Sequence, residues 1–177
     1  MYLITGSRIH TSSATDTDTA SLFLLKKWCY QVLGYADYLV IATDKNLFSK
    51  INQTVSMFGD KIHLLLVNPW KGFAHPLNAI VCESTSLGGN KLLLQSPQVH
   101  VTSTDISILN SHPTSDTWVF GAKMILNHGG DAGIKPIDGM TSPWNNLALW
   151  NLSKLNITRF WKFTADFLRM YRVESKK

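Results

Sequence analysis

Two stretches decide the fold, Asn68-Pro-Trp-Lys-Gly-Phe-Ala-His-Pro-Leu-Asn78 and Gly88-Gly-Asn-Lys-Leu-Leu-Leu-Gln-Ser-Pro-Gln98. The first follows an apolar run, Ile62–Val67, and carries a glycine just before a helix of small and apolar residues. The second is an apolar strand that ends in short polar side chains. A strand, a helix and a second strand in this order form a βαβ unit, in which the two strands are predicted to be parallel.

The same alternation of strands and helices extends back to the N-terminus. Short β-branched and apolar runs alternate with longer segments whose apolar residues recur at helical spacing. Strands are expected at Tyr2–Gly6, Tyr38–Ala42 and Ile62–Val67, and helices at Ala20–Tyr35, Leu47–Phe58 and Pro76–Ser86. This pattern predicts an α/β fold with a mostly parallel sheet covered by helices on both faces.

The second part of the chain is less regular. Asp105–Asn110 is predicted as a short helix and Thr117–Ile125 as a strand. Asn127–Pro143 is predicted as a long loop rich in glycine and proline, followed by a helix over Trp144–Leu155. A chain of 177 residues fits one domain, and neither a repeat nor a low-complexity linker divides it.

Composition excludes several classes of protein. Hydrophobic residues make up 45% of the chain and charged residues 16%, which favours a folded globule over a disordered chain. No stretch approaches the roughly 20 apolar residues of a transmembrane helix. The start of the chain shows no secretory signal, which favours a cytoplasmic protein. Cys29 and Cys82 lie in apolar helical patterns and are expected to be buried free thiols.

The net charge of +5 is concentrated near the C-terminus. Residues 154–177 hold seven Lys and Arg against two acidic residues, a surplus of five. A basic tail can contact nucleic acid, a membrane surface or a phosphate group. Because no nucleic-acid-binding motif accompanies the charge, a solvated basic helix end is favoured over a specific nucleic-acid site. The chain also lacks the glycine-rich fingerprints of ATPases and dehydrogenases.

The βαβ unit resembles the centre of the nucleotide-sugar-binding half of GT-A glycosyltransferases. In that family the helix reads roughly N-x-G-x-x-x-A-x-N, and the next strand ends in an Asp-x-Asp metal motif. The resemblance implies a three-layer α/β/α GT-A-like domain over residues 1–177. Residues 1–100 would form the nucleotide-binding half and residues 101–177 the acceptor-side half. It also implies a nucleotide-diphospho-sugar donor and glycosyl transfer to an acceptor of unknown identity.

The resemblance places the nucleotide at the carboxyl ends of the first strands, where helix N-termini offer N–H groups to phosphates. The candidate residues are Thr5, Gly6, Ser7, Asp44, Gly72 and Asn78, together with Ser96 and Gln98. Asp44 would contact the nucleobase, or it would cap the helix that follows. Gly72 would allow a close approach to the ligand, or it would serve a turn. Asn78 is favoured as a ligand contact because its amide lies in the first turn of an apolar helix.

Ser96 and Gln98 occupy the two Asp positions of the metal motif. A Mg²⁺ or Mn²⁺ ion on a diphosphate prefers anionic oxygen ligands, and these two side chains are neutral. The sequence therefore argues against a divalent metal cofactor. Two consequences stay open: the diphosphate is bound by Lys, Arg and backbone N–H groups, or transfer activity has been lost.

The acceptor side is less well marked. The resemblance makes Glu174 or Asp166 the general base that activates an acceptor hydroxyl, although both also fit as surface carboxylates beside Lys and Arg. Trp144, Asn145 and Asn146 lie where the family has an acceptor-side helix.

Two alternatives to the transferase follow. One is a non-catalytic relative that binds a nucleotide or a protein partner in the same cleft. The other is an unrelated nucleotide-binding protein with a Rossmann-like or flavodoxin-like sheet, in which the GT-A break after the fourth strand would be absent.

Overall fold

The computed structural model describes residues 2–10, 19–122 and 146–160. In these ranges it contains the strands β1 (Tyr2–Ile9), β2 (Tyr38–Thr43), β3 (Ile62–Leu66), β4 (Gly89–Gln95), β5 (Val119–Gly121) and β6 (Leu147–Asn151). The helices are α1 (Thr19–Leu33), α2 (Lys45–Val55), the 3₁₀ helix η2 (Ser56–Lys61), α3 (Ala74–Ser86), α4 (Ser103–Ser111) and α5 (Leu152–Thr158).

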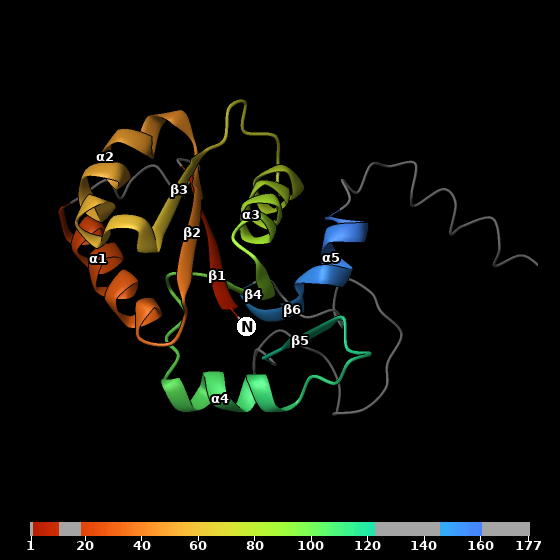
Figure 1. The fold of residues 1–177 in the computed structure, drawn as a ribbon. Coiled ribbons are helices and arrows are strands. Elements are labelled where there is room, and N and C mark those ends of the chain that lie inside the picture. The colour runs from red at the N-terminus through yellow and green to blue at the C-terminus, as the bar shows by residue number, and fades with distance from the viewer. Residues whose placement is uncertain (1, 11–18, 123–145, 161–177) are drawn as a thin grey trace, which may run out of the picture.

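The strands form one mixed sheet in the order β3-β2-β1-β4-β6-β5 (Figure 1). β3, β2, β1 and β4 are parallel. β6 is antiparallel to β4, and β5 is antiparallel to β6. The predicted α/β fold with a mostly parallel sheet is confirmed. The change of direction after β4 is the break that a simple Rossmann-like or flavodoxin-like sheet lacks.

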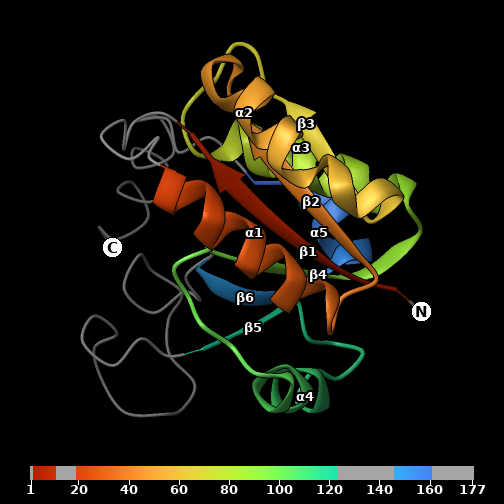
Figure 2. The same ribbon diagram turned by 90° about the vertical axis from the view of Figure 1, so that its left-hand side faces the viewer.

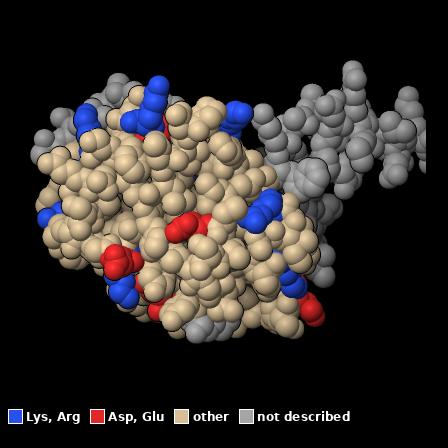
Figure 3. All heavy atoms as spheres, turned by 45° about the horizontal axis from the view of Figure 1, so that its top comes forward, with Lys and Arg blue, Asp and Glu red and all other residues tan. Residues whose placement is uncertain are grey.

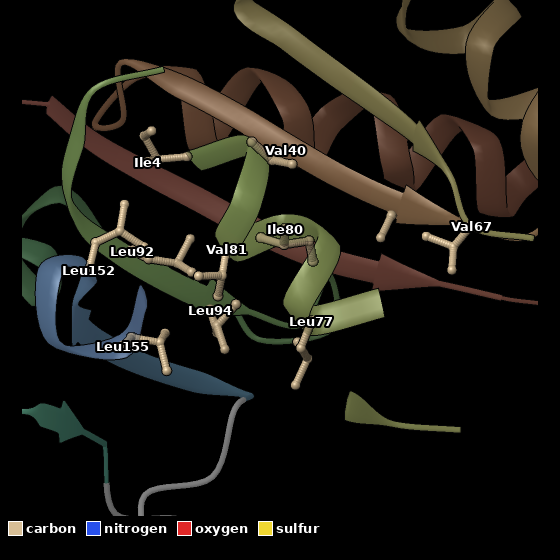
Figure 4. Packing of buried hydrophobic residues seen from close by; sticks show 11 residues of the cluster. Ile4, Val40, Val67, Leu77, Ile80, Val81, Leu92, Leu94, Leu152 and Leu155 are labelled. Carbon is tan, nitrogen blue, oxygen red and sulfur yellow. The ribbon is translucent and has the colours of Figure 1, made fainter. Parts of the chain in front are cut away.

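Helices cover both faces of the sheet, as Figures 1 and 2 show. On one face, α1 and α2 pack against β2 around Leu39 and Ile41, and α4 packs against β4 and β6 around Leu93. On the other face, α3 and α5 pack against β1, β2 and β4. The core there is formed by Ile4, Val40, Val67, Leu77, Ile80, Val81, Leu92, Leu94, Leu152 and Leu155 (Figure 4). The result is the predicted three-layer α/β/α arrangement.

Gly6 sets how closely α3 approaches the centre of the sheet. A Cβ added at Gly6 would lie 2.5 Å from Cγ2 of Ile80 on α3. It would also lie 3.1 Å from Leu92 and 3.2 Å from Leu94 on the neighbouring strand. Carbon atoms in contact normally lie about 3.5–4.0 Å apart, so only glycine fits between β1 and α3 at this position.

The helix predicted over Trp144–Leu155 is wrong. Leu147–Asn151 is a strand, and the helix begins only at Leu152. Leu147, Ala148 and Leu149 are all buried because both faces of β6 are covered. A short run that is apolar on both faces carries no period-two signal and cannot be distinguished from a helix by pattern alone. Pairing with β4 decides the structure.

The remaining elements agree with the predictions to within a few residues at their ends. The predicted strand Thr117–Ile125 is shorter in the described part of the chain, where β5 spans Val119–Gly121 and residues 123–125 are outside the description. The loop predicted over Asn127–Pro143 also lies outside it. Among the described residues, no helix combines the length and apolar character needed to cross a bilayer.

Candidate functional site

The carboxyl ends of β1, β2 and β3 meet at one edge of the sheet. The register pairs Ile9 of β1 with Thr43 of β2, and Thr43 with Leu66 of β3. Beyond β3, the N–H of Val67 donates to the carbonyl of Thr43 at 2.8 Å. This bond holds the start of the segment 67–73, which leads into α3, beside the end of β2. In parallel α/β sheets this edge is where ligands usually bind.

Arg8 is a charged residue near the end of β1 at this edge. Ile4, Gly6 and Arg8 are alternate residues of β1 and therefore face the same side of the sheet, the side covered by α3. The guanidinium of Arg8 lies over the ring of Phe73, 3.8 Å from its centroid. Phe73 is the residue immediately before α3, and it places no side-chain cap on the helix. Arg8 therefore holds its charge beside the uncapped N-terminus of α3.

The described residues offer Arg8 no carboxylate partner. The ion pair that they contain is His63–Glu83, near the start of β3 and the end of α3, and no Asp or Glu lies within 4.0 Å of the Arg8 guanidinium. Arg8 is half-buried, and this burial lowers the pKa of its guanidinium below the ordinary value. A partly desolvated cation without an anion is costly unless a bound anion compensates for it.

Aromatic residues also lie in the segments that follow β1 and precede α3. The rings of His10, after β1, and Trp70, in the segment before α3, have centroids 4.9 Å apart with 38° between their planes. His75 Nδ1 lies 3.1 Å from the carbonyl oxygen of Pro69 in the same segment. The ring that contacts the guanidinium is that of Phe73, and the other rings lie in the segments that adjoin Arg8 and Phe73 in the chain.

Asp44 has the capping position that the sequence left as one of two alternatives. Its Oδ1 accepts hydrogen bonds from the N–H groups of Asn46 at 2.8 Å and Leu47 at 3.2 Å, at the start of α2. The Asp44 side chain is buried, with 7% of its surface exposed. A contact with a nucleobase therefore stays a prediction for a residue that already stabilises a helix end.

Asn78 binds another part of the chain. Its Nδ2 donates to the carbonyl of Phe160 at 2.9 Å, and its Oδ1 accepts from the N–H of Phe160 at 2.7 Å. The amide thus pairs with the backbone that follows α5. Asn78 therefore has a structural role in the described chain, and its contact with a ligand stays a prediction.

The other predicted nucleotide residues near this edge serve the backbone and the core. Gly72 has a φ of +58°, which glycine adopts without strain. A Cβ added at this position would have no heavy atom within 4 Å apart from those of its chain neighbours. Thr5 and Ser7 are buried. As alternate residues they share the face of β1 opposite Gly6 and Arg8. Thr5, Gly6 and Ser7 are thus interior residues of β1, and Arg8 lies nearer its end.

Ser96 and Gln98, at the positions of the metal motif, bond to each other. The hydroxyl of Ser96 donates to Oε1 of Gln98, and the preceding residue, Gln95, is buried and bonded to Tyr35 and Val99. One neutral oxygen of the pair already accepts a hydrogen bond, and neither group is anionic. These residues do not fit a divalent ion on a diphosphate. Within the described ranges, no three His, Cys, Asp or Glu side chains are grouped as metal ligands.

Of the acceptor-side candidates, the structure describes only Asn146. Asn146 lies before β6, and its carbonyl accepts from the N–H of Ser96 at 2.9 Å. The candidates Trp144, Asn145, Asp166 and Glu174 lie outside the described residues.

The two cysteines differ in exposure. Cys29 is buried and free, as predicted, whereas Cys82 is exposed, so its predicted burial is wrong. It lies on α3 on the side that faces α5 and accepts a hydrogen bond from Nη1 of Arg159 at 3.0 Å.

Charged side chains are scattered over the face that includes the segment before α3 (Figure 3). Lys, Arg, Asp and Glu appear there singly or in small groups, and most of the surface belongs to other residues. This distribution suits a site with one well-placed cation and does not resemble a broad basic surface for nucleic acid.

Arg8 was missed by sequence reasoning. The sequence feature that could have indicated Arg8 is a lone arginine at the end of a short apolar strand. In this fold class nucleotides bind at the edge where such strands end. The resemblance directed attention to Thr5, Gly6 and Ser7 immediately before it.

A scan against protein-family models and a search of curated proteins give no match to this chain. Two solved structures have a similar fold. One is 4-diphosphocytidyl-2C-methyl-D-erythritol synthase from Anaerococcus prevotii DSM 20548, with a TM-score of 0.62 and 10% identity over 99% of this chain and 84% of that chain. The other is a further 4-diphosphocytidyl-2C-methyl-D-erythritol synthase, with a TM-score of 0.53 and 11% identity over 97% of this chain and 84% of that chain.

These similarities show that the chain shares the α/β fold of the two synthases. Both neighbours are named as diphosphocytidyl synthases and not as glycosyltransferases, so they do not support the glycosyltransferase family specifically.

Proposed function

We propose that this protein binds a nucleoside diphosphate group, as part of a nucleotide-diphospho-sugar or a related activated compound, at the carboxyl ends of β1, β2 and β3. Arg8 supports the proposal most directly, because its half-buried charge has no carboxylate partner among the described residues. A diphosphate would supply the missing negative charge and accept hydrogen bonds from the planar guanidinium. The uncapped N-terminus of α3 would add backbone N–H groups.

The names of the structural neighbours agree with this ligand class. Both are synthases of a diphosphocytidyl compound, and the family that the sequence resembles uses nucleotide-diphospho-sugars. A nucleoside joined to a diphosphate is common to both. The residues at Ser96 and Gln98 do not fit a metal ion, so the proposal assigns charge neutralisation to Arg8.

The proposed reaction is transfer of a sugar. The bond between the anomeric carbon and the diphosphate oxygen breaks, and its electron pair leaves with the nucleoside diphosphate. An acceptor oxygen forms the new bond to that carbon while a carboxylate, Glu174 or Asp166 in this proposal, takes its proton. Arg8 would lower the barrier by stabilising the charge that develops on the leaving diphosphate.

A non-catalytic nucleotide-binding protein is the second candidate. Asp44 and Asn78, the two residues predicted to contact the donor, both bond to the backbone of this chain. A site that keeps Arg8 while these side chains support the scaffold would bind a nucleotide without the contacts expected of a transferase.

Calorimetric titration with UDP, CDP, GDP and ADP, each with and without EDTA, tests binding. We expect one nucleotide to bind with an affinity that EDTA does not change. Arg8→Gln should weaken that affinity about tenfold to a hundredfold, because a hydrogen bond to a charged group contributes about 1.5–3 kcal/mol. Lys50→Gln is the matched control, since it removes one exposed positive charge from α2, away from the site.

Equal affinities in the Arg8 and Lys50 variants would contradict the proposal, and so would binding that requires a metal. Turnover of the corresponding nucleotide sugar would separate the two candidates. Transfer or hydrolysis of the sugar favours the transferase, and tight binding without turnover favours the binding protein.

A further inference from the structure

A second concave site lies at the opposite end of the sheet from Arg8. It is a cavity of about 270 Å³ between the start of β4, the segment after α4 and the end of β6. β4 begins at this end, and Lys91 pairs there with Asn151, the last residue of the antiparallel β6. The site is therefore separate from the carboxyl ends of β1, β2 and β3.

The cavity presents a cation with neutral partners. Nζ of Lys91 donates to Oδ1 of Asn110 at 3.0 Å and lies 3.5 Å from the carbonyl oxygen of the same residue. Within the described part of the chain, no carboxylate lies within ion-pair distance of Lys91. Lys91 is half-buried, so its charge is held in place without being neutralised.

Other hydrogen-bond donors line the same cavity. Oδ1 of Asn151 accepts from the hydroxyl of Ser153 at 2.7 Å and from the N–H of Lys154 at 3.3 Å, which leaves its Nδ2 group to donate to a ligand. Asn90 adds a second amide and Thr114 a hydroxyl. No Asp or Glu is among the described lining residues, and the exposed Asp116 beside them does not line the cavity.

We propose that this cavity binds a small hydroxylated organic anion that carries a phosphate group. The anionic group would pair with Lys91, and the hydroxyls would bond to the amides and hydroxyls of the wall. Leu149 and Trp150 supply the less polar part of the lining. The volume is slightly below the range of about 300–1,000 Å³ for drug-sized ligands, so the occupant is a small metabolite and not a dinucleotide.

The proposal can be tested by NMR titration of ¹⁵N-labelled protein with ribose 5-phosphate, inorganic phosphate and ribose. The readout is the chemical shift of the side-chain amide signals of Asn90 and Asn151. We expect ribose 5-phosphate to shift both signals with millimolar or tighter affinity. Phosphate should shift them more weakly and ribose not at all. Asn90→Asp preserves the shape of the side chain but adds a negative charge, and it should weaken binding at least tenfold. Asn90→Ala removes only one donor and should weaken it less than threefold.

Three results would overturn the proposal. One is the absence of any shift with either phosphate compound, and another is equal affinity for the Asp and Ala variants at position 90. The third is loss of the response in Arg8→Gln, because the anion would then bind at the edge of β1. The Arg8 variant should otherwise respond like the unchanged protein, so the outcome here is independent of the nucleotide proposal.

Discussion

Replacing Gly6 with alanine tests the packing that brings α3 to the sheet. The added Cβ would lie 2.5 Å from Cγ2 of Ile80, about 1 Å closer than carbon atoms in contact normally approach. Leu92 and Leu94 of the neighbouring strand lie 3.1 and 3.2 Å from the same Cβ, so the space around it is restricted from more than one element. The contact must be relieved by displacement of α3.

The expected loss of stability follows from two opposing effects. Overpacking a core by one methyl group typically costs about 1–3 kcal/mol. Alanine in a strand gains roughly 0.5–1 kcal/mol over glycine because the unfolded chain has less freedom to lose. Overpacking outweighs this gain, and Gly6→Ala should lower the free energy of unfolding by about 1–2 kcal/mol. At this chain length the melting temperature should fall by about 2–4 °C for each kcal/mol.

Urea unfolding of a double-mutant cycle measures whether the contact with Ile80 is the cause. Ile80→Leu moves the branch of the side chain and removes Cγ2 at nearly constant volume, at an expected cost below about 1.5 kcal/mol. In the double variant the two losses should be smaller than their sum by at least about 0.5 kcal/mol. Additive losses, or a Gly6→Ala variant as stable as the unchanged protein, would refute the reasoning.

Two further predictions concern buried groups. Burial raises the pKa of Tyr35 from 10.0 to about 12. The stability linked to its neutral form is therefore complete below pH 10 and is lost as pH rises towards 12. In an absorbance titration one tyrosine should ionise late, and Tyr35→Phe should remove that step. The same variant leaves the buried Oε1 of Gln95 without its donor and should cost about 1–3 kcal/mol in urea unfolding. A thiol reagent should label the exposed Cys82 of the native protein and spare Cys29, which is buried and whose pKa is raised to about 12. Cys82→Ser should abolish the fast labelling, and fast labelling that persists in this variant would contradict the assignment.

The sequence predicted the parallel half of the fold well because each element there has one clear local signal. β2 is buried on both faces and β-branched, and α2 begins at a capping aspartate. β6 carried no such signal. Its five residues, Leu147–Asn151, suit a helix as well as a strand, and pairing with β4 and β5, both distant in the sequence, selects the extended form.

The sequence predicted a site at the carboxyl ends of the first strands, and two of the residues it named, Asp44 and Asn78, bond to the backbone of the chain itself. The location of a site at the strand ends could be inferred from the order of the elements. The role of each side chain there depends on the residues that it contacts, and these are distant in the sequence. Asn78 bonds to Phe160, 82 residues away, and the aromatic partner of Arg8 is 65 residues away at Phe73. A resemblance transferred residue by residue has no information on either pairing.

One face of β1 carries both the residue that sets the packing of α3, Gly6, and the central residue of the proposed site, Arg8. Gly6 allows α3 to approach the sheet, and Arg8, two residues further along the same face, lies under Phe73 at the start of α3. A displacement of α3 by the methyl group of Gly6→Ala would therefore also move the aromatic ring and the helix N-terminus away from the guanidinium. We expect this variant to bind the nucleotide more weakly, although the site proposed around Arg8 does not use position 6 as a ligand contact. Ile80→Leu should restore part of that affinity in Gly6→Ala but none of it in Arg8→Gln, because only the first defect is one of packing. If Ile80→Leu has no effect on the affinity of either variant, the position of α3 does not control the site.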